Sequence, residues 1–304
     1  MELVGFLLGS VLGSFILVLS ERGLTDKTFW GRSCCPNCKK KLAWYDLFPI
    51  LSYLLLQGCC RYCKKRIKVE YLLVEIATGL IIAFLFWQNI KNFQSLCFSN
   101  CVWLNYLDFS IFVLDLIFKI FFIVILVALF ITDLKKMLIP DRIIIPSLKI
   151  GLVSLFLITI YKIGFLYYSL SQSLLGRYLL PPRSDYFVRH ALMIANPLTA
   201  GFITAFLIGG FFWGLIVITK GKGMGGGDVK LGAFMGLILG FPQALVAIVL
   251  SFVTGAIFSI VLLILGKKHF GQTIPFGPFL VLGSLVTLFW GNQIFNWYLH
   301  LSIK

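Results

Sequence analysis

Two aspartates stand at the edges of apolar segments. Asp133 ends the run ILVALFITDLKK, and Asp228 follows three glycines in GMGGGDVKL. An ionisable group at membrane depth is a functional candidate, because charge is costly there. Two carboxylates held close together cannot both ionise easily, so one keeps a proton while the other acts as a base. The pair therefore predicts an aspartic peptidase centre, in which one carboxylate activates water and the other polarises the scissile carbonyl.

The glycines at 225–227 suit peptide cleavage, since they allow unusual backbone angles and close approach of a substrate backbone beside Asp228. Two simpler interpretations stay open at this point. Asp228 also fits the N-cap of an ordinary helix. Asp133 also fits an interfacial ion pair with Lys135 or Lys136.

Six of the eight cysteines lie in residues 21–70, in the two related runs CCPNCKKKL and CCRYCKKRI. Each run contains C-x-x-C, formed by Cys35 and Cys38 in the first and by Cys60 and Cys63 in the second. The spacing is close to that of four-cysteine zinc sites, in which two short turns bring four thiolates to one tetrahedral ion. The pattern predicts a structural zinc site in a zinc-ribbon-like loop.

Other uses of the cysteines are a disulfide framework or a thiol redox pair, and a reducing cytosol argues against stable disulfides. Cys34 and Cys59 offer C-x-x-x-C alternatives for the choice of ligands. Cys97 and Cys101 fit either a disulfide or ordinary thiols, and we assign them no function.

The composition indicates an integral membrane protein. The 304 residues are 59% hydrophobic and 13% charged, whereas a soluble domain is about half apolar and about a quarter charged. The net charge of +15 would suggest nucleic acid in a soluble protein. Here it is explained by Lys and Arg in cytoplasmic loops, so we expect membrane lipid and no nucleic acid as a partner.

The apolar segments predict an all-α polytopic protein with about eight transmembrane helices. They cover approximately residues 2–20, 71–89, 109–132, 143–161, 194–219, 229–240, 243–266 and 275–298. The first has no Lys or Arg before it and reads as a retained span, not as a signal peptide. The sixth is at the short end of what can cross a bilayer.

Alternate loops of this arrangement hold 19 of the 27 Lys and Arg residues, 11 of them in residues 21–70. The positive-inside rule makes that side cytoplasmic, and both aspartates fall on it. We expect a first span at 1–20, a cytoplasmic four-cysteine zinc-binding loop at 21–70, and a seven-span membrane domain at 71–304 that carries the aspartates.

Two further segments have an expected location. The run LAWYDLFPILSYLLLQG lies between the cysteine pairs and is interrupted by Asp46 and Pro49. Its aromatic residues favour the membrane interface over a full span. The insertion at 162–192 falls on the external side.

These motifs, taken in order, resemble those of bacterial prepilin peptidases, also called type IV leader peptidases, along almost the whole chain. The resemblance is carried by the paired C-x-x-C loop and by GSFILVLSERG (13–23), WYDLFPILSYLLLQGCCRYCKKRIKVEYLLVE, DLKKMLIPD (133–141), GGGDVKL (225–231) and IPFGPFLVLG (274–283).

The resemblance implies that Asp133 and Asp228 are the catalytic pair of an intramembrane endopeptidase in the bacterial inner membrane, facing the cytoplasm. Its substrates would be prepilins or pseudopilins of type IV pilus or type II secretion systems, cut after the Gly that ends the leader. It also implies N-methylation of the new terminus with S-adenosylmethionine. Glu75, in VEYLLVE, is then expected near the methylation site; otherwise it snorkels to the cytoplasm or pairs with Lys68.

The run LSERGLT departs from the Tyr-Arg-Leu-Pro usual in the family, so a peptidase without methylation is the alternative. Two other classes compete. Buried acids and Gly-interrupted helices also occur in transporters, but the chain shows no repeat between its halves. A zinc-loop scaffold would leave both aspartates unused.

Overall fold

The computed structural model describes residues 2–25, 28, 31–35, 37–99, 106–172, 174–182, 184–221, 224–266 and 274–302. In this part of the chain the secondary structure is helical, with two isolated β-bridges and no β-strand. The prediction of an all-α protein is confirmed.

The chain forms two compact units, and one helix contributes to both. The first unit contains residues 1–104 and 119–135, and the second contains 105–118 and 136–304. The helix α4 (Tyr106–Lys136) passes from one to the other. The predicted division at residues 20 and 70 follows the membrane boundary instead, and it stays a prediction.

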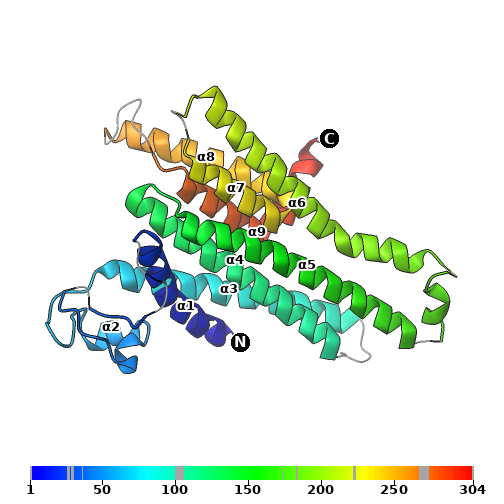
Figure 1. Ribbon diagram of the computed structural model, residues 1–304, viewed down its shortest axis with the longest axis horizontal. Coiled ribbons are helices and arrows are strands. Elements are labelled where there is room, and N and C mark those ends of the chain that lie inside the picture. Colours follow the sequence, from blue (N-terminus) through cyan, green and yellow to red (C-terminus); the bar gives the residue numbers. More distant parts are fainter. Residues whose placement is uncertain are drawn as a thin grey trace. The chain divides into compact units, whose positions relative to one another are not determined.

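In the first unit, α1 (Glu2–Gly23) packs against α3 (Val69–Ser99) (Figure 1). Three glycines four residues apart on α1, the first of them Gly5, face α3. A Cβ atom on Gly9 would lie 2.8 Å from the Cα of Gly79, and one on Gly13 would lie 2.9 Å from the Cα of Glu75. Small residues let membrane helices approach to backbone contact, and this contact holds together the two helices that flank the cysteine loop.

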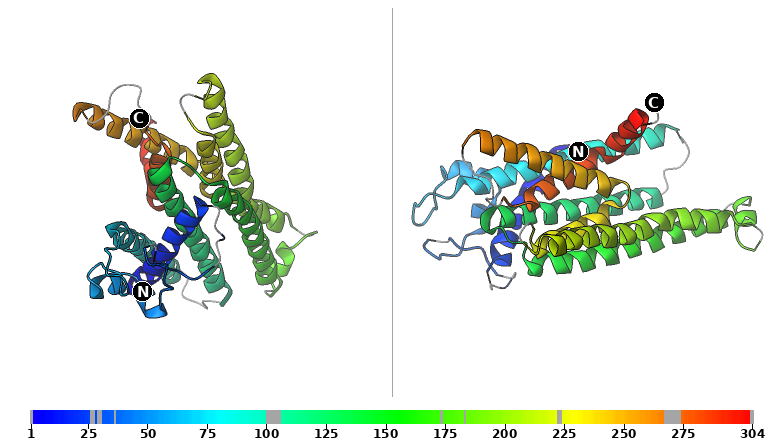
Figure 2. Two further views of the ribbon diagram at one scale, coloured as in Figure 1. Left: turned by 60° about the vertical axis from the view of Figure 1, so that its left-hand side comes forward. Right: turned by 90° about the horizontal axis from the view of Figure 1, so that it is seen from above.

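The second unit is built around a short buried helix, α7. Its members are α5 (Asp141–Gln172), α6 (Tyr186–Ile218), α7 (Gly226–Leu239), α8 (Gln243–Ile264) and α9 (Gly277–Ser302). α7 contacts each of the other four (Figure 2). Gly232 and Gly236 of α7 lie directly against α6. The short helix is therefore enclosed by its neighbours, with Asp228 in its first turn.

Seven helices of the described part are long and apolar enough to cross a membrane, and they coincide with seven of the eight expected spans. The sixth expected span is α7, which has 14 residues. A helix of that length rises about 21 Å, whereas the hydrocarbon core is about 30 Å thick. The chain is a multi-pass membrane protein with seven full-length helices and one short one.

The insertion at 162–192 consists largely of helix. α5 continues to Gln172 and α6 begins at Tyr186, with a single 3-10 turn at Gly176–Leu179 between them. The Tyr, Lys and Ser residues of this stretch interrupt the apolar pattern without breaking a helix, so α5 and α6 are simply longer than their apolar segments.

Candidate metal centre and carboxylates

The first cysteine pair is held by a tight hairpin turn. The backbone N–H of Cys35 donates to the carbonyl of Lys40 (3.0 Å), and the N–H of Lys39 donates to the carbonyl of Cys35 (2.9 Å). A β-bridge between Cys34 and Lys41 closes the turn. Lys39 has a positive φ of 56°, which turns the chain back after the second cysteine of the pair.

The second pair repeats this arrangement 25 residues later. The N–H of Cys60 donates to the carbonyl of Lys65 (2.9 Å), and the N–H of Lys64 donates to the carbonyl of Cys60 (2.9 Å). A β-bridge joins Cys59 to Arg66, and Lys64 has a φ of 51°. The chain thus folds into two equivalent turns, which we call the first and second knuckle.

The knuckles bring four sulfur atoms together. The Sγ atoms of Cys35, Cys38, Cys60 and Cys63 all lie within 4.8 Å of one another, and those of Cys35 and Cys63 are 3.9 Å apart. Thiolates at the corners of a tetrahedral zinc site lie about 3.8 Å apart, given a Zn–S distance of about 2.3 Å. A disulfide would need about 2.05 Å. The four thiols are positioned to bind a metal ion.

The alternative ligands lie outside this group. Cys34 is exposed and Cys59 is half-buried, and neither sulfur belongs to the cluster. Cys101 falls outside the described residues, as does the side chain of Cys97.

The thiols of the cluster have different affinities for protons. The pKa of Cys35 falls to about 7, mainly because the backbone N–H of Cys38 donates to its sulfur, and this outweighs the effect of burial. For Cys63, the N–H of Lys65 acts to lower the pKa, but burial and the neighbouring thiols raise it to about 11. A metal ion binds the thiolate form, so binding at this cluster would release the thiol protons.

Glu75 ties the cysteine loop to α3. Its side chain is buried, and its Oε2 accepts a hydrogen bond from the backbone N–H of Ile50 (2.8 Å). Ile50 has a φ of 61°, so the bond holds the chain at a sharp turn. The carboxylate therefore points toward the cysteine loop. This arrangement differs from both of the simpler expectations, which were snorkelling to the cytoplasm and a pair with Lys68.

Asp133 lies near the end of α4, and its side chain is buried, with 6% of its surface exposed. Lys135, one of its expected partners, pairs with Glu70 of α3 at 3.0 Å. The ion pair joins the end of α4 to the start of α3 within the first unit.

Asp228 is the third residue of α7 and is half-buried. Its Oδ2 accepts a hydrogen bond from the N–H of Gly225 (3.3 Å), so the N-cap is Gly225 and Asp228 occupies the N3 position of a capping box. Gly227 packs against Ile139, whereas open space lies above Gly226. The backbone beside this carboxylate is accessible on one side and held in place on the other.

The lysine of the GGGDVKL motif is engaged in an ion pair. Lys230 Nζ donates to Oδ1 of Asp141, the first residue of α5. An acid in the first helical turn is favourable because it faces the positive end of the helix dipole. The pair links the beginnings of α5 and α7.

The two aspartates belong to different units, Asp133 to the first and Asp228 to the second. Neither unit by itself defines the distance between the two carboxylates. Their pairing as a catalytic dyad stays a prediction.

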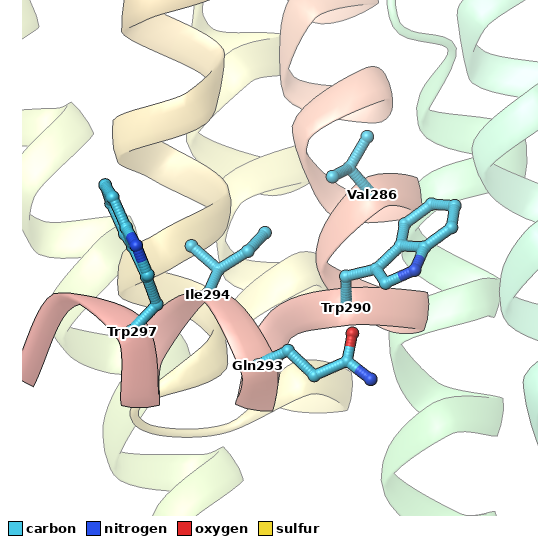
Figure 3. A pocket seen from close by; sticks show the side chains of 5 residues that line it. All are labelled: Val286, Trp290, Gln293, Ile294 and Trp297. Atoms are coloured by element: carbon cyan, nitrogen blue, oxygen red, sulfur yellow. The ribbon is translucent and has the colours of Figure 1, made fainter. Parts of the chain in front are cut away.

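Two apolar pockets lie in the second unit, and no acid lines either of them. One, of about 340 Å³, is formed by one face of α9, where Trp290, Ile294 and Trp297 follow one another on successive turns (Figure 3). The other, of about 590 Å³, lies between α5 and α6 and includes Phe156 and Phe202. Their linings suit acyl chains better than a reacting peptide.

Comparison with known proteins gives two family matches that together cover most of the chain. Residues 7–89 match the bacterial peptidase A24 N-terminal domain, and residues 120–260 match the type IV leader peptidase family. The first range contains the cysteine cluster and Glu75, and the second contains both aspartates.

Curated proteins named prepilin leader peptidase/N-methyltransferase are similar along most of the chain. That of Aeromonas salmonicida (strain A449) is 32% identical over 268 residues, 88% of this chain and 74% of the relative. That of Pseudomonas aeruginosa is 28% identical over 270 residues, 89% and 75%. That of Bacillus subtilis (strain 168) is 28% identical over 299 residues, 98% of each. No solved structure matches.

Proposed function

Because this chain belongs to the prepilin leader peptidase/N-methyltransferase family, we propose that it cleaves and then methylates prepilins or pseudopilins. In this proposal it is an intramembrane aspartic endopeptidase of the bacterial inner membrane. It cuts after the Gly that ends the leader, on the cytoplasmic side, and then transfers a methyl group from S-adenosylmethionine to the new N-terminus.

The observation that carries the peptidase assignment is the setting of Asp228. Its carboxylate stands at the start of a helix whose first residues leave an open backbone surface, where an unwound substrate could lie. Asp133 precedes Ile139 by six residues, and Ile139 packs on Gly227. The segment that follows Asp133 in the sequence therefore packs on the helix that carries Asp228.

The proposed chemistry uses the two carboxylates in complementary states. One removes a proton from water as the water oxygen attacks the carbonyl carbon, while the other donates a hydrogen bond to the carbonyl oxygen. The carboxyl that took the proton from water gives it to the leaving nitrogen as the C–N bond breaks, and the pair returns to its starting state.

Zinc is the metal that we propose for the four cysteines, with a structural role. Four thiolates complete a tetrahedral zinc site and leave no position open for substrate. The ion would hold the two knuckles together, and Glu75 would hold the segment between them through Ile50. Methyl transfer by this loop would need the amine uncharged and placed in line with the donor.

Asn substitution of each aspartate tests the peptidase assignment, because Asn keeps the size of Asp but cannot act as a base. Asp133→Asn and Asp228→Asn should each lower cleavage of a prepilin by at least about a hundredfold. Asp141→Asn, which changes an exposed acid paired with Lys230, is the matched control and should cleave normally. Cleavage at a near wild-type rate by either dyad variant would refute the assignment.

A substrate already cut to its mature N-terminus separates the two activities. With S-adenosylmethionine, the Asp228→Asn protein should still add one methyl group to this substrate, as measured by mass spectrometry, although it fails to methylate an intact prepilin. If the wild type methylates neither, the protein is a peptidase only. If it neither cleaves nor methylates, the transporter and scaffold alternatives regain support.

A further inference from the structure

The segment between the knuckles carries a group of large apolar side chains on its surface. It consists of the 3-10 turn η1 (Trp44–Leu47), the short helix α2 (Leu51–Leu55) and the residues between them. We call its exposed apolar residues the apolar wedge; they are Trp44, Leu47, Phe48, Leu51, Leu54 and Leu55. Leu55 is 82% exposed and Trp44 is 75% exposed. A contiguous group of this kind marks an interaction surface.

The bond between Glu75 and Ile50 sets the depth of the wedge relative to α3. The charged pair of Glu70 and Lys135 marks the polar end of α3 and α4. Glu75 follows Glu70 by five residues, a rise of about 7.5 Å along the helix. Since the Ile50 N–H is 2.8 Å from the Glu75 carboxylate, the wedge lies at this depth. Interfacial apolar faces are buried about 5–10 Å into the boundary between headgroups and acyl chains.

The charge around the wedge indicates the kind of lipid. The knuckles present exposed cations on both sides of it, namely Lys39, Lys40, Lys41, Lys64, Lys65 and Arg66. Asp46 is the single acid in the sequence between residues 31 and 69, and it pairs with Arg61 at 2.8 Å. Cations near an anionic membrane surface strengthen binding to it.

We propose that the apolar wedge inserts into the bilayer that holds the helices, while the knuckle cations bind anionic phospholipid headgroups. The cysteine cluster is then held at the membrane surface by the protein's own loop. The proposal is independent of the assigned catalytic residues. The other occupant that chemistry allows is an apolar segment of a protein, either a prepilin or a second copy of this chain.

Photocrosslinking of the full-length protein in nanodiscs of phosphatidylethanolamine and phosphatidylglycerol tests the insertion. Benzoylphenylalanine replaces Leu55 or Trp44 in the wedge. Leu73, 61% exposed on α3, serves as the lipid-facing control, and Lys220, exposed beyond the end of α6, serves as the water-facing control. Lipid adducts are measured by mass spectrometry. The wedge positions should give adducts within about twofold of Leu73 and well above Lys220.

Adduct yields at Leu55 and Trp44 no higher than at Lys220 would overturn the proposal. So would adducts to added prepilin or to a second copy of the chain in place of lipid, since the surface would then be a protein docking site.

A measurement on the unmodified protein covers the case in which the substituted loop does not fold. Hydroxyl-radical labelling attacks aromatic rings that water reaches, and Trp is at least as reactive as Tyr. Tyr62 of the second knuckle is 40% exposed, whereas Trp44 is 75% exposed on the protein itself. In nanodiscs Trp44 should nevertheless be labelled several times more slowly than Tyr62. Equal or faster labelling of Trp44 means that the wedge faces water, and it overturns the proposal.

Discussion

A single methyl group on Gly236 should weaken the peptidase, because α7 and α6 touch there through their backbones. A Cβ atom at this position would lie 2.9 Å from the Cα of Ala205 and 2.9 Å from the carbonyl oxygen of Thr204. Neither atom can rotate away. Carbon atoms pack at about 3.5 Å or more, so the Gly236→Ala variant must separate the two helices by roughly 0.5 Å.

The expected cost follows from two opposing effects. Overpacking a filled interior costs about 1–3 kcal/mol, and replacing Gly by Ala within a helix returns up to about 1 kcal/mol. The net loss of stability should be about 1–2 kcal/mol. Asp228 lies eight residues away on the same helix and moves with it. Because a misplacement of about 1 Å can cost about a hundredfold in rate, we expect cleavage to fall on the order of tenfold.

The assay compares Gly236→Ala with Gly210→Ala, since a Cβ on Gly210 of α6 would meet nothing within 4 Å. Prepilin cleavage and the melting temperature of the purified protein are measured for both. The Gly210→Ala control should cleave like the wild type and should melt at the same temperature or slightly above it. If Gly236→Ala also matches the wild type, or if both variants lose equally, the contact between α6 and α7 does not position Asp228.

Four further predictions concern the cysteine loop and the lysine of α7. Zinc binding should weaken as the pH falls from 8 to 6, by about tenfold per pH unit for each thiol proton released. The cause is the raised pKa of Cys63, since this thiol must lose its proton to bind metal. An indicator for free zinc measures the affinity, and an affinity that does not change with pH would contradict the prediction. Cys60→Ser should lower the bound zinc measured in the purified protein while leaving prepilin cleavage intact. Gly58→Ala should release zinc at a lower temperature than the wild type, since Gly58 has a φ of 68° and a Cβ there would lie 2.9 Å from Tyr53 Oη; the left-handed conformation alone costs about 1–2 kcal/mol. Lys230→Met should lower stability by no more than about 1 kcal/mol and should preserve cleavage, whereas a loss like that of Asp228→Asn would give Lys230 a catalytic role.

The helices could be predicted from the sequence because length and apolarity report membrane helices directly. Every expected span coincides with a helix. The segment 229–240 differs from the other spans. The sequence predicts a short span there, and the structure has a 14-residue helix enclosed by four others. Enclosure depends on glycines of α6 and α7 that let each helix approach residues of the other closely, and no single segment reveals this. The ends of α5 and α6 within 162–192 were missed for a local reason, since polar residues stop an apolar pattern before they stop a helix.

The cysteine site could also be predicted, because each C-x-x-C turn is local and its repetition after 25 residues is visible in the sequence. The contact made by Glu75 could not be predicted in the same way. Its partner is a backbone N–H at Ile50, and backbone groups carry no signal in the identities of the residues. The same holds for Glu70 and Lys135, which are 65 residues apart in the sequence and become partners only in the folded chain.

The short length of α7 has a consequence for the supply of water. Its rise of about 21 Å falls about 9 Å short of the hydrocarbon thickness. A bilayer adapts to such a mismatch by thinning locally or by letting polar groups reach inward. The first turn of α7 carries glycine N–H groups and the Asp228 carboxylate, and these polar groups attract water. In the proposed peptidase, local thinning of the bilayer at this helix end would bring water to Asp228 without a path through acyl chains.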